Sequence, residues 1–152
     1  MAKVAIVVPV FNGQNYLKES LESIKNQTFV DFEVLIVDDG SNLKTDVAQI
    51  VITIDDGRFK ILHKDNGGVA SALNYGISQA KSEFIAWLSH DDIWERRKLE
   101  TQLISFEKDT NMISFSNYFL VDQDSQIFGF TNFEDEHKQP VFAKYSLTYS
   151  SP

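Results

Sequence analysis

Short apolar runs alternate with longer amphipathic segments along most of this chain. The runs are rich in β-branched and aromatic residues and bounded by turn residues, so they predict β-strands. Three of them, at 3–10, 32–38 and 84–88, are apolar at nearly every position. We expect these three to be buried on both faces, as in a parallel sheet. A shorter strand is predicted at 59–63.

The segments between the strands have helical spacing of apolar residues. After a turn that ends at Asn15, a helix is predicted up to about Gln27, since Leu17, Leu21 and Ile24 share one face. Strands that alternate with helices in this way predict βαβ units and an α/β fold with a mostly parallel sheet. The other predicted helices are about 44–54, 69–80 and 95–107, the last with Leu99, Leu103 and Phe106 inward.

A different pattern follows the last helix. Residues 112–121 and 126–130 predict a strand pair that turns near 122–125, and no element is predicted from Phe133 to Pro152. With 152 residues, of which 43% are hydrophobic, the chain can bury one core. We therefore predict a single domain over residues 1–152.

Polar side chains follow three of the predicted strands. Asn12 comes after the first strand, Asp38 and Asp39 end the second, and His90 to Asp92 follow the fourth. In open parallel sheets, ligands bind outside the carboxyl ends of the strands. We expect these residues to meet at one binding site.

Two interpretations of Asp38 and Asp39 remain open, because Gly40 and Ser41 follow them. One is turn chemistry, with Asp39 or Ser41 capping the next helix. The other is a carboxylate that accepts hydrogen bonds from a ligand's ring N–H or ribose hydroxyls.

Asp91 and Asp92 are adjacent carboxylates, which repel each other unless a cation is close. Mg²⁺ and Mn²⁺ take oxygen ligands, typically one or two carboxylates together with phosphate oxygens. The alternative is helix capping before Trp94. The net charge of -8 favours the metal, because an acidic chain needs a local cation to hold a phosphate ligand.

Several function classes are excluded or disfavoured. Ser89, His90 and Asp91 are consecutive, and neighbours on an extended chain point in opposite directions, so they cannot form a hydrolase triad. Residues 66–68 lack the glycine spacing of dinucleotide and nucleoside-triphosphate loops. The glycines there are either turn and packing residues or ligand contacts. A net charge of -8 without a basic stripe argues against nucleic acid.

The composition limits the compartment in which this protein is expected and the kinds of site that it can have. The absence of cysteine excludes disulfides and thiolate metal sites and fits a reducing compartment. No apolar stretch approaches the ~18 residues of a membrane span, and no signal peptide is visible, so we predict a cytoplasmic protein. Peripheral membrane association through further sequence stays open. Trp87 and Trp94 are expected to anchor the core.

Four segments, taken together, resemble family 2 glycosyltransferases from Lys3 to about Gly129. They are V-A-I-V-V-P-V-F-N-G, L-E-S-I-K-N-Q-T-F-V-D-F-E-V-L-I-V-D-D-G-S, N-G-G-V-A-S-A-L-N-Y-G-I-S-Q-A and F-I-A-W-L-S-H-D-D-I-W. The resemblance implies a three-layer, Rossmann-like GT-A fold and a nucleotide-diphosphate sugar donor, most often UDP-linked. It also implies Mn²⁺ or Mg²⁺, inversion at the anomeric carbon and a role in polysaccharide biosynthesis.

The resemblance also implies residue roles. Pro9 to Asn12 would line the base pocket, Asp39 would read the uracil edge, Asp91 would bind the ribose and Asp92 the metal. The expected donor-binding residues are Pro9, Val10, Phe11, Asn12, Asp38, Asp39, Gly68, Asn74 and Asp91, with Asp92 as the metal ligand. Many relatives carry an Asp where this chain has Ser89, so metal binding should depend chiefly on Asp92.

The resemblance implies that the acceptor side and the general base lie beyond Pro152, so we expect a C-terminally truncated chain that cannot complete catalysis alone. The acceptor would be a glycan, a lipid or a protein. Two other functions stay open. A sugar-nucleotide nucleotidyltransferase would want a basic, glycine-rich loop where this chain has Phe11 to Gly13. A non-catalytic nucleotide-binding or scaffold domain would keep the pocket without the chemistry.

Overall fold

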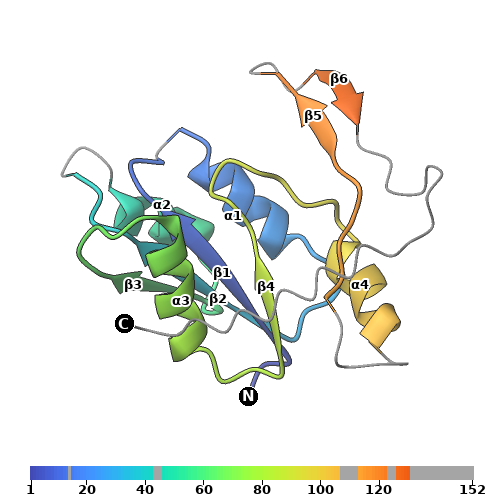
Figure 1. Ribbon diagram of the computed structural model, residues 1–152, viewed down its shortest axis with the longest axis horizontal. Helices are drawn as coiled ribbons and strands as arrows, with labels where there is room; N and C mark the ends of the chain where they lie inside the picture. Colours follow the sequence, from blue (N-terminus) through green and yellow to red (C-terminus); the bar gives the residue numbers. More distant parts are fainter. Residues whose placement is uncertain (14, 43–45, 107–112, 123–125, 131–152) are drawn as a thin grey trace. The chain divides into compact units, whose positions relative to one another are not determined.

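The computed structural model describes residues 1–13, 15–42, 46–106, 113–122 and 126–130 (Figure 1). The chain divides into two compact units, Met1–Asn111 and Met112–Pro152, which are described separately. The elements of the first unit are β1 (Val4–Val10), α1 (Leu17–Lys25), β2 (Phe32–Asp38), α2 (Val47–Ile54), β3 (Phe59–His63), α3 (Val69–Gln79), β4 (Phe84–Trp87) and α4 (Lys98–Phe106).

The first unit is built on a four-stranded parallel sheet in the order β3-β2-β1-β4. Val4 of β1 pairs with Phe32 of β2 on one side and with Phe84 of β4 on the other. The chain steps outward from β1 to β2 and β3, then returns to the far side of β1 for β4. The change of direction between β1 and β4 is a topological switch point, where such sheets bind ligands.

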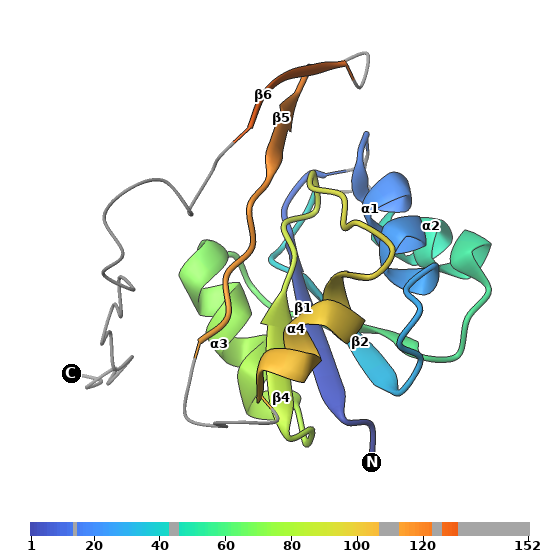
Figure 2. The ribbon, with the colours of Figure 1, turned by 90° about the vertical axis from the view of Figure 1, so that its right-hand side faces the viewer.

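Helices cover both faces of this sheet, which makes three layers. α1 and α2 lie on one face and α3 on the other (Figure 2). The larger core joins alternate residues of β1, including Ile6 and Val8, to α1, α2 and Leu99 of α4. The smaller core joins Val7 and Val37 to Ala72 of α3. The predicted α/β fold with a mostly parallel sheet is confirmed.

The packing predicted for α1 is confirmed, and α3 packs closely on the sheet through a glycine. Leu17, Leu21 and Ile24 of α1 are fully buried against the sheet. A Cβ atom added to Gly76 of α3 would lie 2.5 Å from Cγ1 of Val7, so only glycine allows this close approach of helix and strand.

The prediction that β4 is buried on both faces is wrong. β4 is an edge of the described sheet, and Ile85 and Trp87 are 45% and 56% exposed. These two side chains share a sheet face with Val7, since Trp87 is its register partner. Trp87 therefore does not anchor the core, whereas Trp94, at 8% exposure, does.

The fourth predicted helix begins later than expected. α4 starts at Lys98, and residues 88–97 form an irregular segment, called here the 88–97 loop. Asp91 and Asp92 lie several residues before Lys98, where α4 begins, so they do not cap this helix. No helix in the described part of the chain is long and apolar enough to cross a membrane.

In the second unit, β5 (Phe119–Val121) pairs antiparallel with β6 (Ile127–Phe130). The predicted strand pair is thus confirmed, with a shorter first strand. Most of the turn predicted at 122–125 and the segment from Phe133 onward lie outside the described residues.

Candidate functional site

The loops that follow the four parallel strands lie at the carboxyl edge of the sheet, and hydrogen bonds link the loops after β1, β2 and β3. Asn12, after β1, donates its backbone N–H to Oγ of Ser41 over 3.0 Å. Its side-chain Oδ1 accepts the backbone N–H of Asn42 over 3.0 Å. Asn12 has a φ of 54°, a left-handed conformation that asparagine tolerates better than most residues. The predicted meeting of the first two loops is therefore observed.

Asp38 forms a turn at the end of β2. Its Oδ1 accepts the N–H of Ser41 over 3.0 Å, and its Oδ2 lies 3.2 Å from Nδ1 of His63, the last residue of β3. The turn interpretation is correct for Asp38. The capping interpretation is wrong, because Asp46 caps α2 by accepting the N–H of Gln49.

Asp39 is 2% exposed and lies at the amino end of α3. Its carboxylate accepts the backbone N–H groups of Gly67 and Gly68, the latter over 2.7 Å, and the ammonium of Lys64 over 2.5 Å. Asn66 adds a side-chain hydrogen bond to the Asp39 carbonyl oxygen. Helix amino ends favour a negative charge, which suits a carboxylate at this position. Through its hydrogen bonds, Asp39 holds the loop between β3 and α3 onto the end of β2.

The charge of Asp39 is stabilised by these contacts. Burial alone raises the pKa of the Asp39 carboxyl, but the Lys64 ammonium and the N–H groups of Gly67 and Gly68 outweigh burial, so the pKa falls below its usual range. Asp39 is therefore ionised at neutral pH and already bonded to groups of the protein.

Asp91 and Asp92 lie in the 88–97 loop after β4, and both are exposed. The N–H of Asp92 donates to the carbonyl oxygen of Ser89 over 3.2 Å, which closes a turn around the pair. Partial shielding from water raises the pKa of the Asp92 carboxyl, and the charge of Asp91 raises it further, while His90 lowers it. A nearby cation would favour the ionised form of this carboxyl.

The loops after β1 and β4 touch at the switch point. A Cβ atom on Gly13 would lie 2.1 Å from Cδ2 of His90, so the imidazole packs directly against this glycine. The segment that carries Asp91 and Asp92 is thereby placed beside Asn12. Asp39 and Asp92 follow the carboxyl ends of β2 and β4, so they belong to the same edge of the parallel sheet.

The other expected donor-binding residues differ in exposure. Pro9 and Val10 are buried within β1, whereas Phe11 is 49% exposed and Asn12 is exposed. Asn74 is exposed on α3, more than one helical turn beyond its start. Of the Pro9 to Asn12 segment, only the last two side chains reach the surface of the edge.

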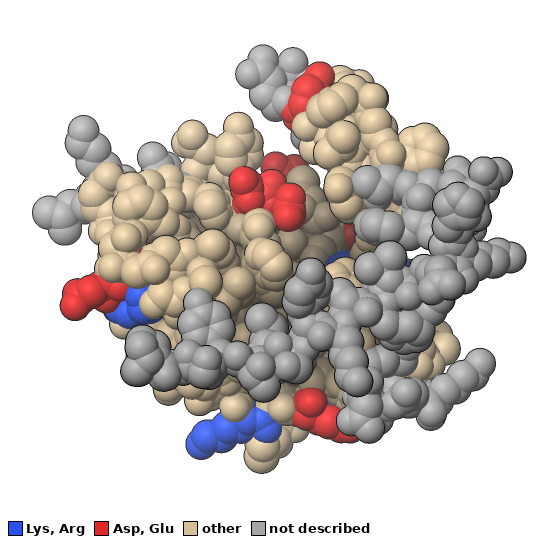
Figure 3. Space-filling model, in the orientation of Figure 1, with Lys and Arg blue, Asp and Glu red and all other residues tan. Residues whose placement is uncertain are grey.

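The Asp91 and Asp92 carboxylates can supply a divalent ion with part of its oxygen ligands. Within the described ranges there is no group of three or more His, Asp or Glu residues that could hold a metal ion. Mg²⁺ and Mn²⁺ commonly take only one or two carboxylates from the protein and complete their coordination with phosphate and water oxygens. The residues present therefore fit such an ion only together with a phosphate ligand. On the face shown in Figure 3, one group of acidic side chains lies near the upper centre, and others lie at the left and lower margins.

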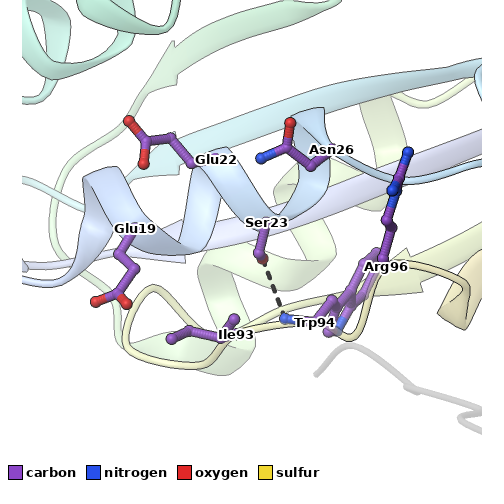
Figure 4. A pocket seen from close by; sticks show the side chains of 7 residues that line it. All are labelled: Glu19, Glu22, Ser23, Asn26, Ile93, Trp94 and Arg96. Atoms are coloured by element: carbon purple, nitrogen blue, oxygen red, sulfur yellow. Dashed lines mark hydrogen bonds between the residues drawn. The ribbon is translucent and has the colours of Figure 1, made fainter. Parts of the chain in front are cut away.

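A pocket of about 290 Å³ lies elsewhere, between α1 and the 88–97 loop (Figure 4). It does not include Asn12, Asp39 or Asp92. Its lining residues are Glu19, Glu22, Ser23, Asn26, Ile93, Trp94 and Arg96. None of the expected donor-binding residues lines this pocket.

The partners of the acidic residues were not predicted from the sequence. Lys64 and Asn66 stand in the polar run K-D-N-G-G directly after β3, and this position at a strand end was the available signal. Ser20, Ser23 and Gln27 were not predicted either, although they recur at i, i+3 and i+7 beside the apolar residues of α1.

A parallel sheet with a polar switch point places the chain among α/β proteins that bind ligands at strand ends. The chain belongs to glycosyl transferase family 2, whose profile matches residues 5–147. It is 41% identical over 124 residues to an uncharacterized glycosyltransferase of Rickettsia typhi, covering 80% of this chain and 38% of that protein. It is 37% identical over 130 residues to glycosyltransferase GlyG of Streptococcus pneumoniae, covering 84% of this chain and 42% of GlyG.

Solved structures show the same GT-A-like fold. Residues 1–349 of S. aureus TarS in complex with UDP-GlcNAc match with a TM-score of 0.65 and 29% identity, over 71% of this chain and 32% of that one. The mannosyltransferase PcManGT of Pyrobaculum calidifontis, in complex with GDP-Man and Mn²⁺, matches with a TM-score of 0.62 and 25% identity, over 71% of this chain and 33% of that one. The chain thus spans less than half the length of each of these proteins.

Proposed function

We propose that this chain forms the donor-binding part of an inverting glycosyltransferase that uses a UDP-linked sugar and a divalent metal ion. The observation that carries the proposal is the pair Asp91 and Asp92 at the β4 end of the switch point, beside Asn12 and Gly13. Support comes from the family membership and from the likeness to TarS bound to UDP-GlcNAc.

In this proposal, different residues at the carboxyl edge of the sheet bind the base and the ribose of the nucleotide. Phe11 and Asn12 line the base pocket, and Asp38 and Gly68 shape it through the turns they form. Asp39 reads the base: the ring N–H of the base would donate to the Asp39 oxygen that now accepts the Lys64 ammonium. Asp91 binds the ribose, and Asn74 lies at the margin of the site.

Asp92 is the proposed metal ligand. A bound Mn²⁺ or Mg²⁺ would neutralise charge on the diphosphate leaving group. As the bond between the anomeric carbon and the diphosphate oxygen breaks, its electron pair goes to that oxygen. The acceptor hydroxyl oxygen bonds the carbon from the opposite side, and its proton goes to a general base. We place that base, and the site for a glycan, lipid or protein acceptor, outside the described residues.

Calorimetric titration with UDP, with and without Mn²⁺, tests this function. Wild type should bind UDP more tightly with Mn²⁺, and Asp92→Ala should lose that gain, at a cost of about tenfold or more in affinity. Asp31→Ala is the matched control, because Asp31 is an exposed acid at the opposite end of β2. It should behave as wild type.

Two results would contradict the proposal in different ways. If wild type binds no UDP in either condition, the chain is better described as a scaffold domain. If UDP binds equally well with and without Mn²⁺, donor binding stands and the role of Asp92 as a metal ligand is wrong.

A further inference from the structure

α1 presents a polar stripe to the 88–97 loop. The stripe consists of Ser20 and Ser23 of α1 and of Gln27, two positions after the end of the helix, and it runs beside the apolar face of α1. Ser20 is 1% and Gln27 4% exposed. Burying polar groups is costly unless they are hydrogen-bonded, and every buried side-chain nitrogen or oxygen in the described residues has a partner. The partners of the stripe therefore explain why it is polar.

The two serines hold the loop on either side of the acidic pair. The Ser20 hydroxyl donates to the carbonyl oxygen of His90 over 2.8 Å. The Ser23 hydroxyl accepts the backbone N–H of Trp94 over 3.1 Å (Figure 4) and donates to the Ser20 carbonyl oxygen. The fixed residues are thus one position before Asp91 and two positions after Asp92.

Gln27 fixes the rest of the loop. Its Nε2 donates to the carbonyl oxygen of Glu95 over 2.8 Å, and its Oε1 accepts the N–H of Leu99 in the first turn of α4 over 3.1 Å. The backbone N–H of Thr28 donates to the carbonyl oxygen of Arg96. A loop without regular secondary structure thus has its backbone bonded at several points to α1 and to the residues that directly follow it.

From these contacts we infer that Ser20, Ser23 and Gln27 are positioning residues, which hold Asp91 and Asp92 in place to receive the metal-bound diphosphate. The inference rests on the proposed function. Adjacent carboxylates on a mobile loop would separate to relieve their repulsion. Ordering them again when the ligand binds would cost entropy and weaken the affinity. The stripe orders the loop before the ligand arrives.

Matched variants separate positioning from stability. Ser23→Ala removes the hydroxyl that binds Trp94, and Ser23→Thr keeps it. Ser78→Ala is the control, since the Ser78 hydroxyl on α3 makes the same kind of bond, to the carbonyl oxygen of Tyr75, without touching the loop. Gln27→Met removes the amide with little change of volume. Ser23 is only partly buried, so its variants should fold even if Gln27→Met does not.

The measurements are calorimetric UDP affinity with and without Mn²⁺, and hydrogen exchange of peptides that cover residues 88–97. In Ser23→Ala and Gln27→Met, loop exchange should increase and the gain from Mn²⁺ should fall by about threefold to tenfold. UDP affinity without Mn²⁺ should change much less. Ser23→Thr should restore the gain, and Ser78→Ala should match wild type.

The inference is overturned if Ser23→Ala and Gln27→Met exchange faster in the loop but keep the full gain from Mn²⁺, or if the loop exchanges as in wild type. Donor binding by wild type would stand in both cases. If wild type itself binds no UDP, the proposed function fails, and the positioning role fails with it.

Discussion

Asp39 combines deep burial with a full charge. A carboxylate in such a position is tolerated because two backbone N–H groups and the Lys64 ammonium bond it. The contact couples β2 to the loop before α3, which are 25 or more residues apart in the chain. Asp39 is therefore as much a part of the fold as of the proposed donor site, and its substitution should affect both.

Asp39→Asn should lower the free energy of unfolding near neutral pH by about 1–3 kcal/mol, because an amide cannot bond the ammonium or both N–H groups as well. The pKa of Asp39 is lower in the folded protein than in the unfolded chain. Its stabilisation is therefore present above the unfolded value of about 3.9 and is lost as the pH falls through the folded value.

Urea unfolding at about pH 7 and at about pH 3 tests this, and the gap between wild type and Asp39→Asn should narrow at the lower pH. Asp31→Asn controls for the general loss of a surface charge. A gap that is constant with pH would show that the ionised carboxylate is not what stabilises the loop.

At the scale of elements, the hydrophobic pattern was sufficient for β1, β2 and α1, because their periodicity reflects burial in the final core. The pattern gave the wrong burial for β4, because an apolar run looks the same in the sequence whether its strand is central or at an edge of the sheet. It also failed for the 88–97 loop, where hydrogen bonds from α1, about 70 residues away, replace the expected first turn of a helix. Strand order and these distant contacts depend on the assembled fold.

The same assembly explains why sequence analysis predicted the site only in outline. Parallel strands bring Asn12, Asp38 and Asp92 to one edge, and the rule for strand ends was enough to predict this. The side-chain partners were not predictable. Lys64 meets Asp39 only because β3 lies beside β2, an adjacency that no local pattern encodes.

The packing of α3 on β1 gives a prediction for an element. Gly76→Ala should destabilise the protein by about 1–3 kcal/mol, because the new methyl group would meet Val7 at 2.5 Å in a packed core. The higher helix propensity of alanine offsets only about 1 kcal/mol.

Gly57→Ala is the matched control. No atom lies within 4 Å of a Cβ at Gly57, and the φ of Gly57 is not in the left-handed range. The stability of the Gly57→Ala protein should therefore equal that of wild type or be slightly higher. Thermal unfolding of the two variants provides the comparison. Equal stability of Gly76→Ala and wild type would mean that α3 shifts outward without cost.

For the whole molecule, the net charge of -8 sets the conditions under which it can hold a diphosphate. The Lys64 ammonium at this edge is already paired with Asp39, and Asp91 and Asp92 of the 88–97 loop are exposed carboxylates. Without a divalent ion, UDP should therefore be repelled by the protein as a whole. Uridine, which has no phosphate, should not be.

The negative net charge predicts an unusual salt dependence of UDP affinity. Between about 0.01 M and about 0.1 M salt the Debye length falls from about 30 Å to about 10 Å, so repulsion between UDP and the acidic chain should weaken. UDP affinity without metal should then rise several-fold, whereas uridine affinity should stay constant. The gain in UDP affinity from Mn²⁺ should shrink, because salt also screens the attraction of the ion for the carboxylates and the diphosphate. Titrations of both ligands across this range measure all three effects. A steep fall of metal-free UDP affinity with salt would instead indicate a cationic phosphate site, with Lys64 released from Asp39 to bind the diphosphate in place of a metal ion.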